Sequence, residues 1–200
     1  MDNIQTYNFS EKEGKLCVEF AREALKKYTV EGQRLDVGSV DEPLNRRGGV
    51  LIRLESQGMF GGQLKGNAAI YDGRRISDAI IDAIIYASSS RSIGSEIRKS
   101  EIDNITIQLS LIEKVTITKE PVEYIDVGKD CFIIPKELGI WLYPTKPVEH
   151  NWNAKEYIDR TYRSSQINPK EWDDKNVAIA TVKSFFEHFG YGMPIVDEPK

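Results

Sequence analysis

The chain has 200 residues, of which 40% are hydrophobic and 29% are charged, and its formal net charge is −4. A chain of this size can bury a sizeable core without disulfides or metal ions, so we expect a single domain over residues 1–200, with a core at about 14–189 and flexible ends at 1–9 and 190–200. The small negative charge argues against nucleic-acid binding, which depends on an excess of Lys and Arg.

Nothing in the sequence indicates export or membrane insertion. No stretch approaches the ~20 consecutive apolar residues of a membrane-spanning helix, and residues 1–10 lack the basic and apolar segments of a signal peptide. The two cysteines, Cys17 and Cys131, form neither a Cys-x-x-Cys pair nor a disulfide framework. We therefore predict a cytoplasmic protein with two buried free thiols, and a bridge between them stays open as an alternative.

The first third of the chain predicts a helix followed by a β hairpin. Ser10 can cap a helix that ends near Tyr28, because apolar residues recur there at helical spacing. After a polar loop, residues 49–55 (GVLIRLE) are typical of a largely buried strand. The glycine-rich residues 58–62 would turn the chain into a returning strand at 67–71, which gives an antiparallel hairpin with a long tip.

The middle of the chain predicts a second helix and the clearest strand. Ser77 can cap a helix that continues to about Ala87. The small residues of 88–96 indicate a loop. Residues 105–111 alternate apolar and polar side chains, as a half-exposed strand does, and we expect residues 115–122 to form the connection after it.

The last third predicts two short strands, a helix and a final strand. The short strands are expected at 131–134 and 140–143, and Asn153 can cap a helix over 154–164. Residues 177–189 favour a strand, although their phenylalanines would also suit a helix. This order of hairpin, helices and alternating strands predicts an α+β fold.

The segment GGQLKGNAAIYDG, residues 61–73, combines glycines with a Lys and an Asn but matches no phosphate loop. Such a loop has its Lys after the last glycine and leads into a helix, whereas Lys65 precedes a glycine and a strand is expected next. His150 and His188 are too far apart in sequence to indicate a metal site. No local pattern marks a nucleophile, so we predict no catalytic residue, no metal and no cofactor.

Several segments in this order resemble the AMMECR domain family, from about Gly14 to Phe189. They are LCVEFAREAL, GGVLIRLES, GGQLKGNAAI, IDNITIQLSLIEKV, YIDVGKDCFII, GIWLYP and HNWNAKEYIDR. The resemblance implies an α+β fold with a mainly antiparallel sheet flanked by helices and a smaller α/β lobe. It also implies a pathway shared with Memo-like or radical-S-adenosylmethionine proteins, because related domains occur beside them.

The chain departs from this family at its hallmark motif, Leu-Arg-Gly-Cys-Ile-Gly. Residues 64–69 fall on that motif, with Lys65 in place of the Arg and Asn67 in place of the Cys. Lys keeps the positive charge but lacks the bidentate fork of Arg, and Asn cannot supply a thiolate. Of the family's Asp-Pro-Arg-Phe stretch, only Arg91 remains.

These departures favour a non-catalytic binding or adaptor domain. We predict a small, mildly cationic pocket formed by Lys65, Gly66, Asn67 and Arg91, which would bind a small anionic ligand or the acidic loop of a partner protein. In a second reading, an enzyme uses Lys65 as an electrostatic stabiliser and a nearby carboxylate as base, in a deep cleft where that carboxylate has a perturbed pKa. In a third, Lys65 and Asn67 are only turn and strand-edge residues. The protein is expected to be a monomer or a homodimer.

Overall fold

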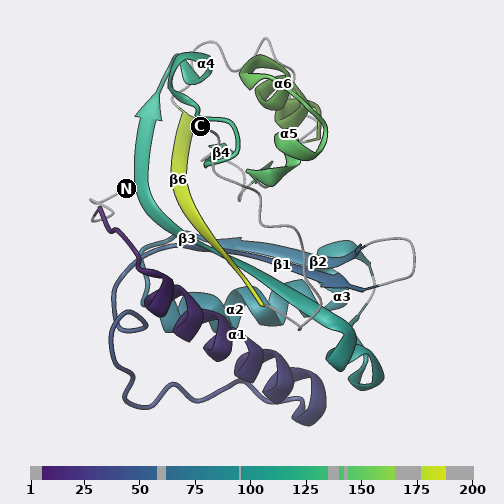
Figure 1. Cartoon of the computed structure of the whole chain (residues 1–200). Helices are drawn as coiled ribbons and strands as arrows, with labels where there is room; N and C mark the ends of the chain where they lie inside the picture. The colour runs from purple at the N-terminus through teal and green to yellow at the C-terminus, as the bar shows by residue number, and fades with distance from the viewer. Residues whose placement is uncertain are drawn as a thin grey trace.

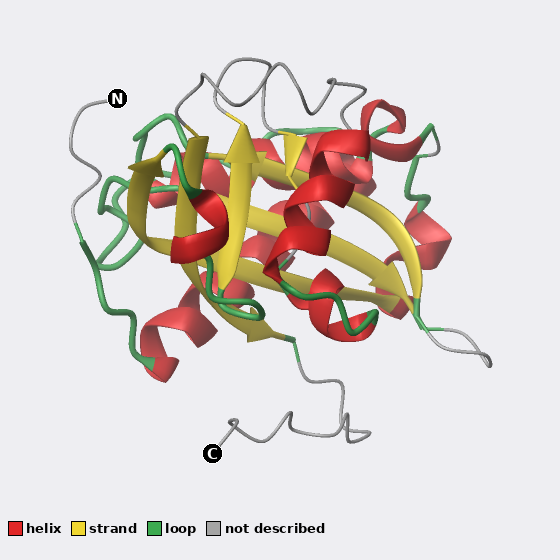
Figure 2. Cartoon of the chain, turned by 90° about the horizontal axis from the view of Figure 1, so that it is seen from above, coloured by secondary structure: helices red, strands yellow, loops and turns green. Residues whose placement is uncertain are grey.

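A curved sheet with helices on both sides forms the body of the protein. The computed structural model describes residues 6–57, 62–94, 96–134, 140–141, 144–164 and 177–187. The long helices α1 (Glu11–Glu31) and α2 (Ile76–Ser88) lie along one face of the sheet (Figure 1). A smaller lobe with α4 (Pro121–Tyr124), α5 (Thr145–Glu149) and α6 (Ala154–Ser164) lies beyond the other face (Figures 1 and 2).

Within the described residues the sheet has six strands in the order β2-β1-β3-β6-β4-β5, and all neighbours are antiparallel. This arrangement confirms the predicted α+β class and its antiparallel sheet. The strands are β1 (Val50–Ser56), β2 (Gln63–Ile70), β3 (Ile105–Thr118), β4 (Asp130–Ile134), β5 (Ile140–Trp141) and β6 (Val177–Phe186).

Helix α1 begins at the predicted cap. The Ser10 Oγ accepts a hydrogen bond from the Glu13 backbone N at 3.3 Å, and the Glu13 carboxylate accepts one from the Ser10 backbone N at 2.8 Å. This capping box provides hydrogen-bond acceptors for two backbone N–H groups that have no partner within the first turn of the helix. The helix continues three residues past Tyr28, to Glu31, and Gly32 ends it with a left-handed φ of 68°.

Helix α2 differs from the prediction, because Ser77 is not its cap. Arg75 holds the cap position, and Ser77 is fully buried within the first turn. The backbone N of Ser77 donates to the Leu44 carbonyl at 3.0 Å, and that of Ile76 donates to the Arg46 carbonyl at 2.8 Å. The preceding loop therefore supplies the acceptors that a side-chain cap would otherwise provide.

Strand β3 is much longer than predicted, since residues 115–118 extend the strand where we expected a connection. Strand β6 pairs along this extension as far as Thr118, with an irregularity between Ile112 and Lys114. The irregularity changes the alternation of buried and exposed side chains, which hides the second half of the strand from a periodicity argument. The same pairing confirms that the final segment forms a strand and not a helix, over Val177–Phe186.

Two more segments differ in their bounds. Strand β2 begins at Gln63, so the Leu-Lys-Gly-Asn motif lies inside a strand and not at a hairpin tip; residues 58–61 lie outside the described part of the chain. The predicted loop at 88–96 contains the short helix α3 (Ser90–Ile93). The cap of α6 is as predicted, because the Glu156 backbone N donates to Asn153 Oδ1 at 3.0 Å.

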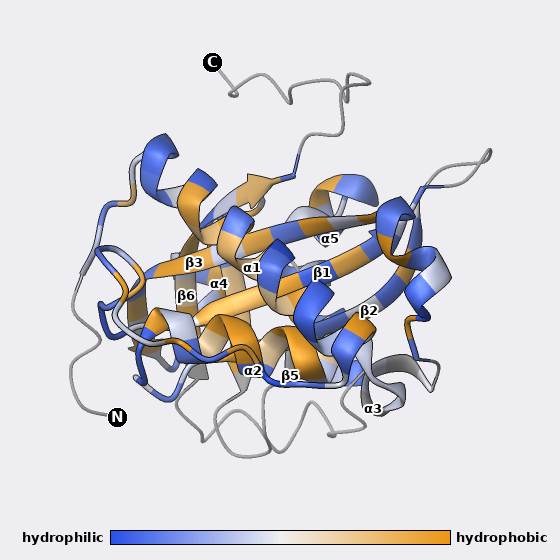
Figure 3. Ribbon diagram, turned by 90° about the horizontal axis from the view of Figure 1, so that it is seen from below, coloured by the Kyte–Doolittle hydropathy of each residue, from blue (hydrophilic) through white to orange (hydrophobic). Residues whose placement is uncertain are grey.

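The two faces of the sheet bury different clusters. The main core lies between the sheet and helices α1 and α2, and includes Ile52, Leu54 and Cys17. A second cluster on the opposite face includes Leu51 and Cys131. Both cysteines are buried thiols outside any disulfide, as predicted. Seen from below, α1 presents hydrophilic residues outward, whereas α2 is largely hydrophobic (Figure 3).

The N-terminal segment before α1 packs against the body of the protein. Tyr7 and Phe9 fall in the segment expected to be flexible, but their backbone N–H groups donate to Glu113, and Phe9 is 1% exposed. Among the described helices, none combines the length and apolar character needed to cross a membrane.

Candidate binding site

Gly66 lies on the face of β2 that packs against helix α2. It is buried, and a Cβ placed on it would come within 1.7 Å of the Ala87 carbonyl oxygen. That oxygen belongs to the backbone of a packed helix and cannot move aside easily. Gly66 is therefore required by the close approach of β2 and α2, which is a structural role.

Lys65 lies at the irregularity of the β1–β2 pairing, where the register shifts between Leu54 and Glu55 and Lys65 has no partner residue on β1. Its Nζ lies 2.9 Å from Glu101 Oε1. The hydrogen bond from Lys65 lowers the pKa of Glu101 below its ordinary value, helped by a backbone hydrogen bond from Arg98. The structure thus pairs the ammonium with a carboxylate, and Lys65 adds less positive charge to its surroundings than the sequence suggested.

Asn67 lies on the edge strand of the sheet, where helix α3 closes the edge. Its backbone N donates to Ser92 Oγ at 2.8 Å, and that hydroxyl lies 2.9 Å from the Asn67 carbonyl oxygen and 3.2 Å from Asn67 Oδ1. The Ser92 hydroxyl therefore provides the backbone of Asn67 with the hydrogen-bond acceptor and donor that a neighbouring strand would otherwise supply. Arg91 precedes Ser92 in α3, which brings its backbone near the motif; its side chain lies outside the described part of the structure.

Three polar residues lie side by side on the face turned away from α1 and α2. Arg53 of β1 is the Cα partner of both Asn67 of β2 and Gln108 of β3. We call Asn67, Arg53 and Gln108 the polar row. Sequence reasoning missed Arg53 and Gln108. A signal existed for Arg53, which stands alone within the apolar run of β1, whereas Gln108 is one of several polar residues that alternate along β3.

Arg53 connects the sheet to the smaller lobe. Its Nη1 donates to Glu149 Oε1 of α5 at 2.9 Å, and its Nη2 lies 2.5 Å from Glu55 Oε1 of its own strand. The Arg53 side chain is only 14% exposed, against 39% for Glu149. Figure 1 shows α5 in the lobe above strands β1 and β2.

Gln108 holds an unused hydrogen-bond donor. The residue is 7% exposed, and its Nε2 is buried without a hydrogen-bond partner in the structure. A buried polar group without a partner costs roughly 1–3 kcal/mol, so an acceptor atom bound at this position would be stabilised by the Gln108 donor. The donor lies next to Arg53 in the polar row, where an acceptor atom would be used by both residues.

Two carboxylates near the polar row, Glu149 and Glu101, have pKa values below their ordinary range. Partial burial pushes the pKa of Glu149 upward, but the hydrogen bond and charge of Arg53 outweigh it and hold the pKa below its ordinary value. The pKa of Glu101 is lowered as well. Both carboxylates therefore stay ionised near neutral pH and are weak bases, whereas a catalytic base works best with a pKa near the working pH.

Neither cysteine can replace the thiol that the hallmark motif lacks. Burial raises the pKa of Cys17 to about 12, and burial raises the pKa of Cys131 further. Thiolates are the reactive form of cysteine, and these two groups stay protonated.

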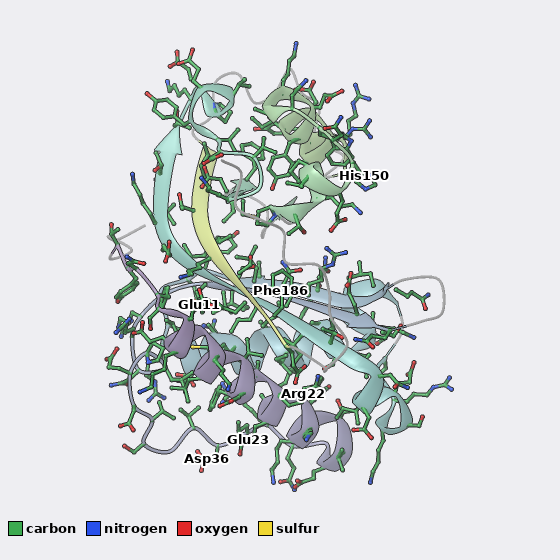
Figure 4. The ribbon with its side chains drawn as sticks, in the orientation of Figure 1. Glu11, Arg22, Glu23, Asp36, His150 and Phe186 are labelled. Carbon is green, nitrogen blue, oxygen red and sulfur yellow. The ribbon has the colours of Figure 1, made fainter. Side chains whose placement is uncertain are left out.

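A surface groove of about 860 Å³ lies elsewhere, between α1 and the end of β6. Figure 4 labels Glu11, Arg22, Glu23 and Phe186, which lie along it. None of its lining residues belongs to the Leu-Lys-Gly-Asn motif. Phe186, one of its lining residues, is the Cα partner of Gln108 in the polar row.

The fold and the site together define a two-lobed α+β protein, with a curved antiparallel sheet, two long helices on one face, and a glycine-containing motif on the edge strand. The sequence profile of the AMMECR1 family matches residues 18–185, and the chain therefore belongs to the AMMECR1 family.

Relatives in archaea support this assignment. The chain is 31% identical to protein VNG_2543C of Halobacterium salinarum over 187 residues, which cover 90% of this chain and 89% of that protein. It is 25% identical to a Methanocella arvoryzae protein over 195 residues, covering 94% and 96%. The crystal structure of the uncharacterized protein PH0010 from Pyrococcus horikoshii has the same fold, with a TM-score of 0.76, 22% identity, and coverage of 92% and 95%.

Proposed function

We propose that this AMMECR1-family protein is a non-catalytic binding domain whose site is the polar row, with the Leu-Lys-Gly-Asn motif at its border. The observation that carries the proposal is the buried, unpartnered Nε2 of Gln108 beside Arg53. A bound acceptor atom would satisfy this donor and recover its desolvation cost.

A binding role agrees with the chemistry of the site. Asn67 stands where a thiol would be needed for covalent chemistry, and amides bind ligands through hydrogen bonds alone. Lys65 is held by Glu101 at the border of the row, and we propose Arg91 as a further cation there. These groups suit a small anionic ligand or an acidic loop of a partner protein.

We propose a cytoplasmic monomer or homodimer that acts with another protein. Because domains related to this family occur beside Memo-like or radical-S-adenosylmethionine proteins, those proteins are the first partners to test.

A thermal-shift screen with small metabolites, nucleotides and S-adenosylmethionine tests the proposal. A ligand that binds only the folded state stabilises it by about 2.7 kcal/mol when the ligand is present at 100 times its Kd, and this raises the midpoint temperature of unfolding. We expect the shift in the wild type and its loss in Gln108→Met, which keeps the volume but removes the donor. Glu123→Ala, an exposed site in the smaller lobe, should respond like the wild type. A ligand that shifts the Gln108 variant equally binds elsewhere, and one that is converted to product supports the enzyme reading.

A further inference from the structure

We infer that the polar row binds the carboxylate of a small molecule, and that Glu149 is the internal occupant of the same position, which the ligand displaces. This inference rests on the proposed function, and it specifies the chemical class of the ligand and the side chain that competes with it.

The guanidinium of Arg53 divides its nitrogens between two carboxylates. Nη1 bonds Glu149 and Nη2 bonds Glu55, at 2.9 and 2.5 Å. A guanidinium bonds a single carboxylate best when two parallel hydrogen bonds form. Nη1 also donates to Thr145 Oγ1 at 3.4 Å, so the nitrogen that contacts Glu149 is shared with a second acceptor.

Glu149 is the partner that can leave. Glu55 is two residues from Arg53 on the same strand, so its position is fixed by the strand itself. Glu149 belongs to α5, a helix of five residues in the smaller lobe, and its side chain is 39% exposed. It also has a second cation, Lys146, at 3.6 Å, which can keep it paired after it leaves Arg53.

Gln108 explains why an external carboxylate would be preferred. A free carboxylate has two oxygens, of which one can accept from Arg53 Nη1 and the other from Gln108 Nε2. Glu149 satisfies only the first of these donors, since Gln108 Nε2 has no hydrogen-bond partner. Because that nitrogen is buried, the ligand reaches it as the Glu149 side chain withdraws. A small molecule thereby gains a hydrogen bond that the tethered side chain does not make.

The charge balance favours a carboxylate over a phosphate. The cations around the row are already matched by carboxylates: Lys65 by Glu101, Arg53 by Glu55 and Glu149, and Lys146 by Glu149. Exchange of one carboxylate for another leaves the charge beside Arg53 unchanged. A doubly charged phosphate would add an uncompensated negative charge next to Glu55.

Displacement of Glu149 would also change the contact between the two lobes. The Arg53–Glu149 pair joins β1 to α5, residues 96 positions apart in sequence. A bound carboxylate would remove this contact and leave the hydrogen bond from Arg53 Nη1 to Thr145 Oγ1, at 3.4 Å, between β1 and α5, so the smaller lobe is the responsive element.

The experiment uses acetate as a probe for wild type, Glu149→Ala and the matched control Glu123→Ala. The readout is the Gln108 side-chain amide signal in NMR spectra of isotope-labelled protein, with sodium chloride at equal ionic strength as the reference. Removing an internal competitor raises the fraction of protein that can bind, so we expect Glu149→Ala to bind acetate at least about tenfold more tightly than wild type. Glu123→Ala should match wild type. Glu149→Gln, which keeps the side-chain size, checks that any gain does not come from a disturbed α5.

Three different results would contradict three different parts of the inference. Equal acetate affinities in wild type, Glu149→Ala and Glu149→Gln would overturn the role of Glu149, while the proposed binding function would stand. Phosphate or chloride that moves the Gln108 amide as strongly as acetate would overturn the carboxylate assignment. An unmoved Gln108 amide in all variants would overturn the whole inference, and the metabolite screen with Gln108→Met remains the separate test of the proposed function.

Discussion

At the scale of single residues, Gly66 has the most sharply defined constraint. An added methyl group would meet the Ala87 carbonyl oxygen at 1.7 Å, so Gly66→Ala must push β2 away from α2. We expect a loss of about 3 kcal/mol in the free energy of unfolding, measured by urea denaturation. Gly62→Ala is the control, because its Cβ would meet atoms of the Glu55 side chain, the nearest at 3.0 Å, and no backbone atom comes as close. A Gly66 variant as stable as the Gly62 variant would contradict the packing described here.

Ser92 carries the second prediction at this scale. Its hydroxyl is the hydrogen-bond partner of the Asn67 backbone at the sheet edge. Ser92→Ala should cost about 1 kcal/mol of stability, because an edge N–H and C=O lose their partner to water. Ser90→Ala, an exposed position on the same short helix, should leave the urea midpoint unchanged. Equal losses in both variants would assign the effect to α3 and not to this hydrogen bond.

At the scale of secondary-structure elements, the contact between β1 and α5 should depend on pH. The pKa of Glu149 is lowered in the folded protein, so its pairing with Arg53 contributes stability above the unfolded pKa of about 4.3 and loses it as the pH falls through the folded pKa. Glu149 is partly exposed, and the gain near neutral pH should be no more than about 1 kcal/mol. Stability curves of wild type and Glu149→Gln should converge as the pH falls below about 4. A gap that persists there would have a cause other than the charge.

The elements also show how far the sequence could predict the fold and the site. Helix α1 and strand β1 followed from caps and alternation, which are local signals. The polar row did not, because alternation gives the face of Arg53 but not its neighbours across the sheet. Those neighbours depend on strand register, and β3 begins 49 residues after the last residue of β1. The contact with Glu149 lies still further along the chain, 96 residues away, where no local pattern reaches.

At the scale of the whole molecule, the two cysteines report on whether the protein unfolds as one unit. Cys17 lies in the main core under α1, and Cys131 lies in the cluster on the opposite face of the sheet, with residues of β4 and β6. Both are fully buried and protonated, so a maleimide should label neither in the native protein near neutral pH. Labelling then requires opening, and its rate reports the free energy of that opening.

If residues 1–200 form the single domain we predict, both thiols should react at similar rates, each limited by global unfolding. The comparison uses the variants Cys17→Ala and Cys131→Ala, each with one remaining thiol, and corrects for the stability of each. Faster labelling of Cys131 would mean that the smaller lobe separates from the sheet while α1 stays packed. Because the Arg53–Glu149 pair is a contact between these parts, Glu149→Ala should then accelerate the labelling of Cys131 and leave that of Cys17 unchanged. Equal rates in every variant would instead place the two lobes in one cooperative unit, and Glu149 could leave Arg53 without opening the structure.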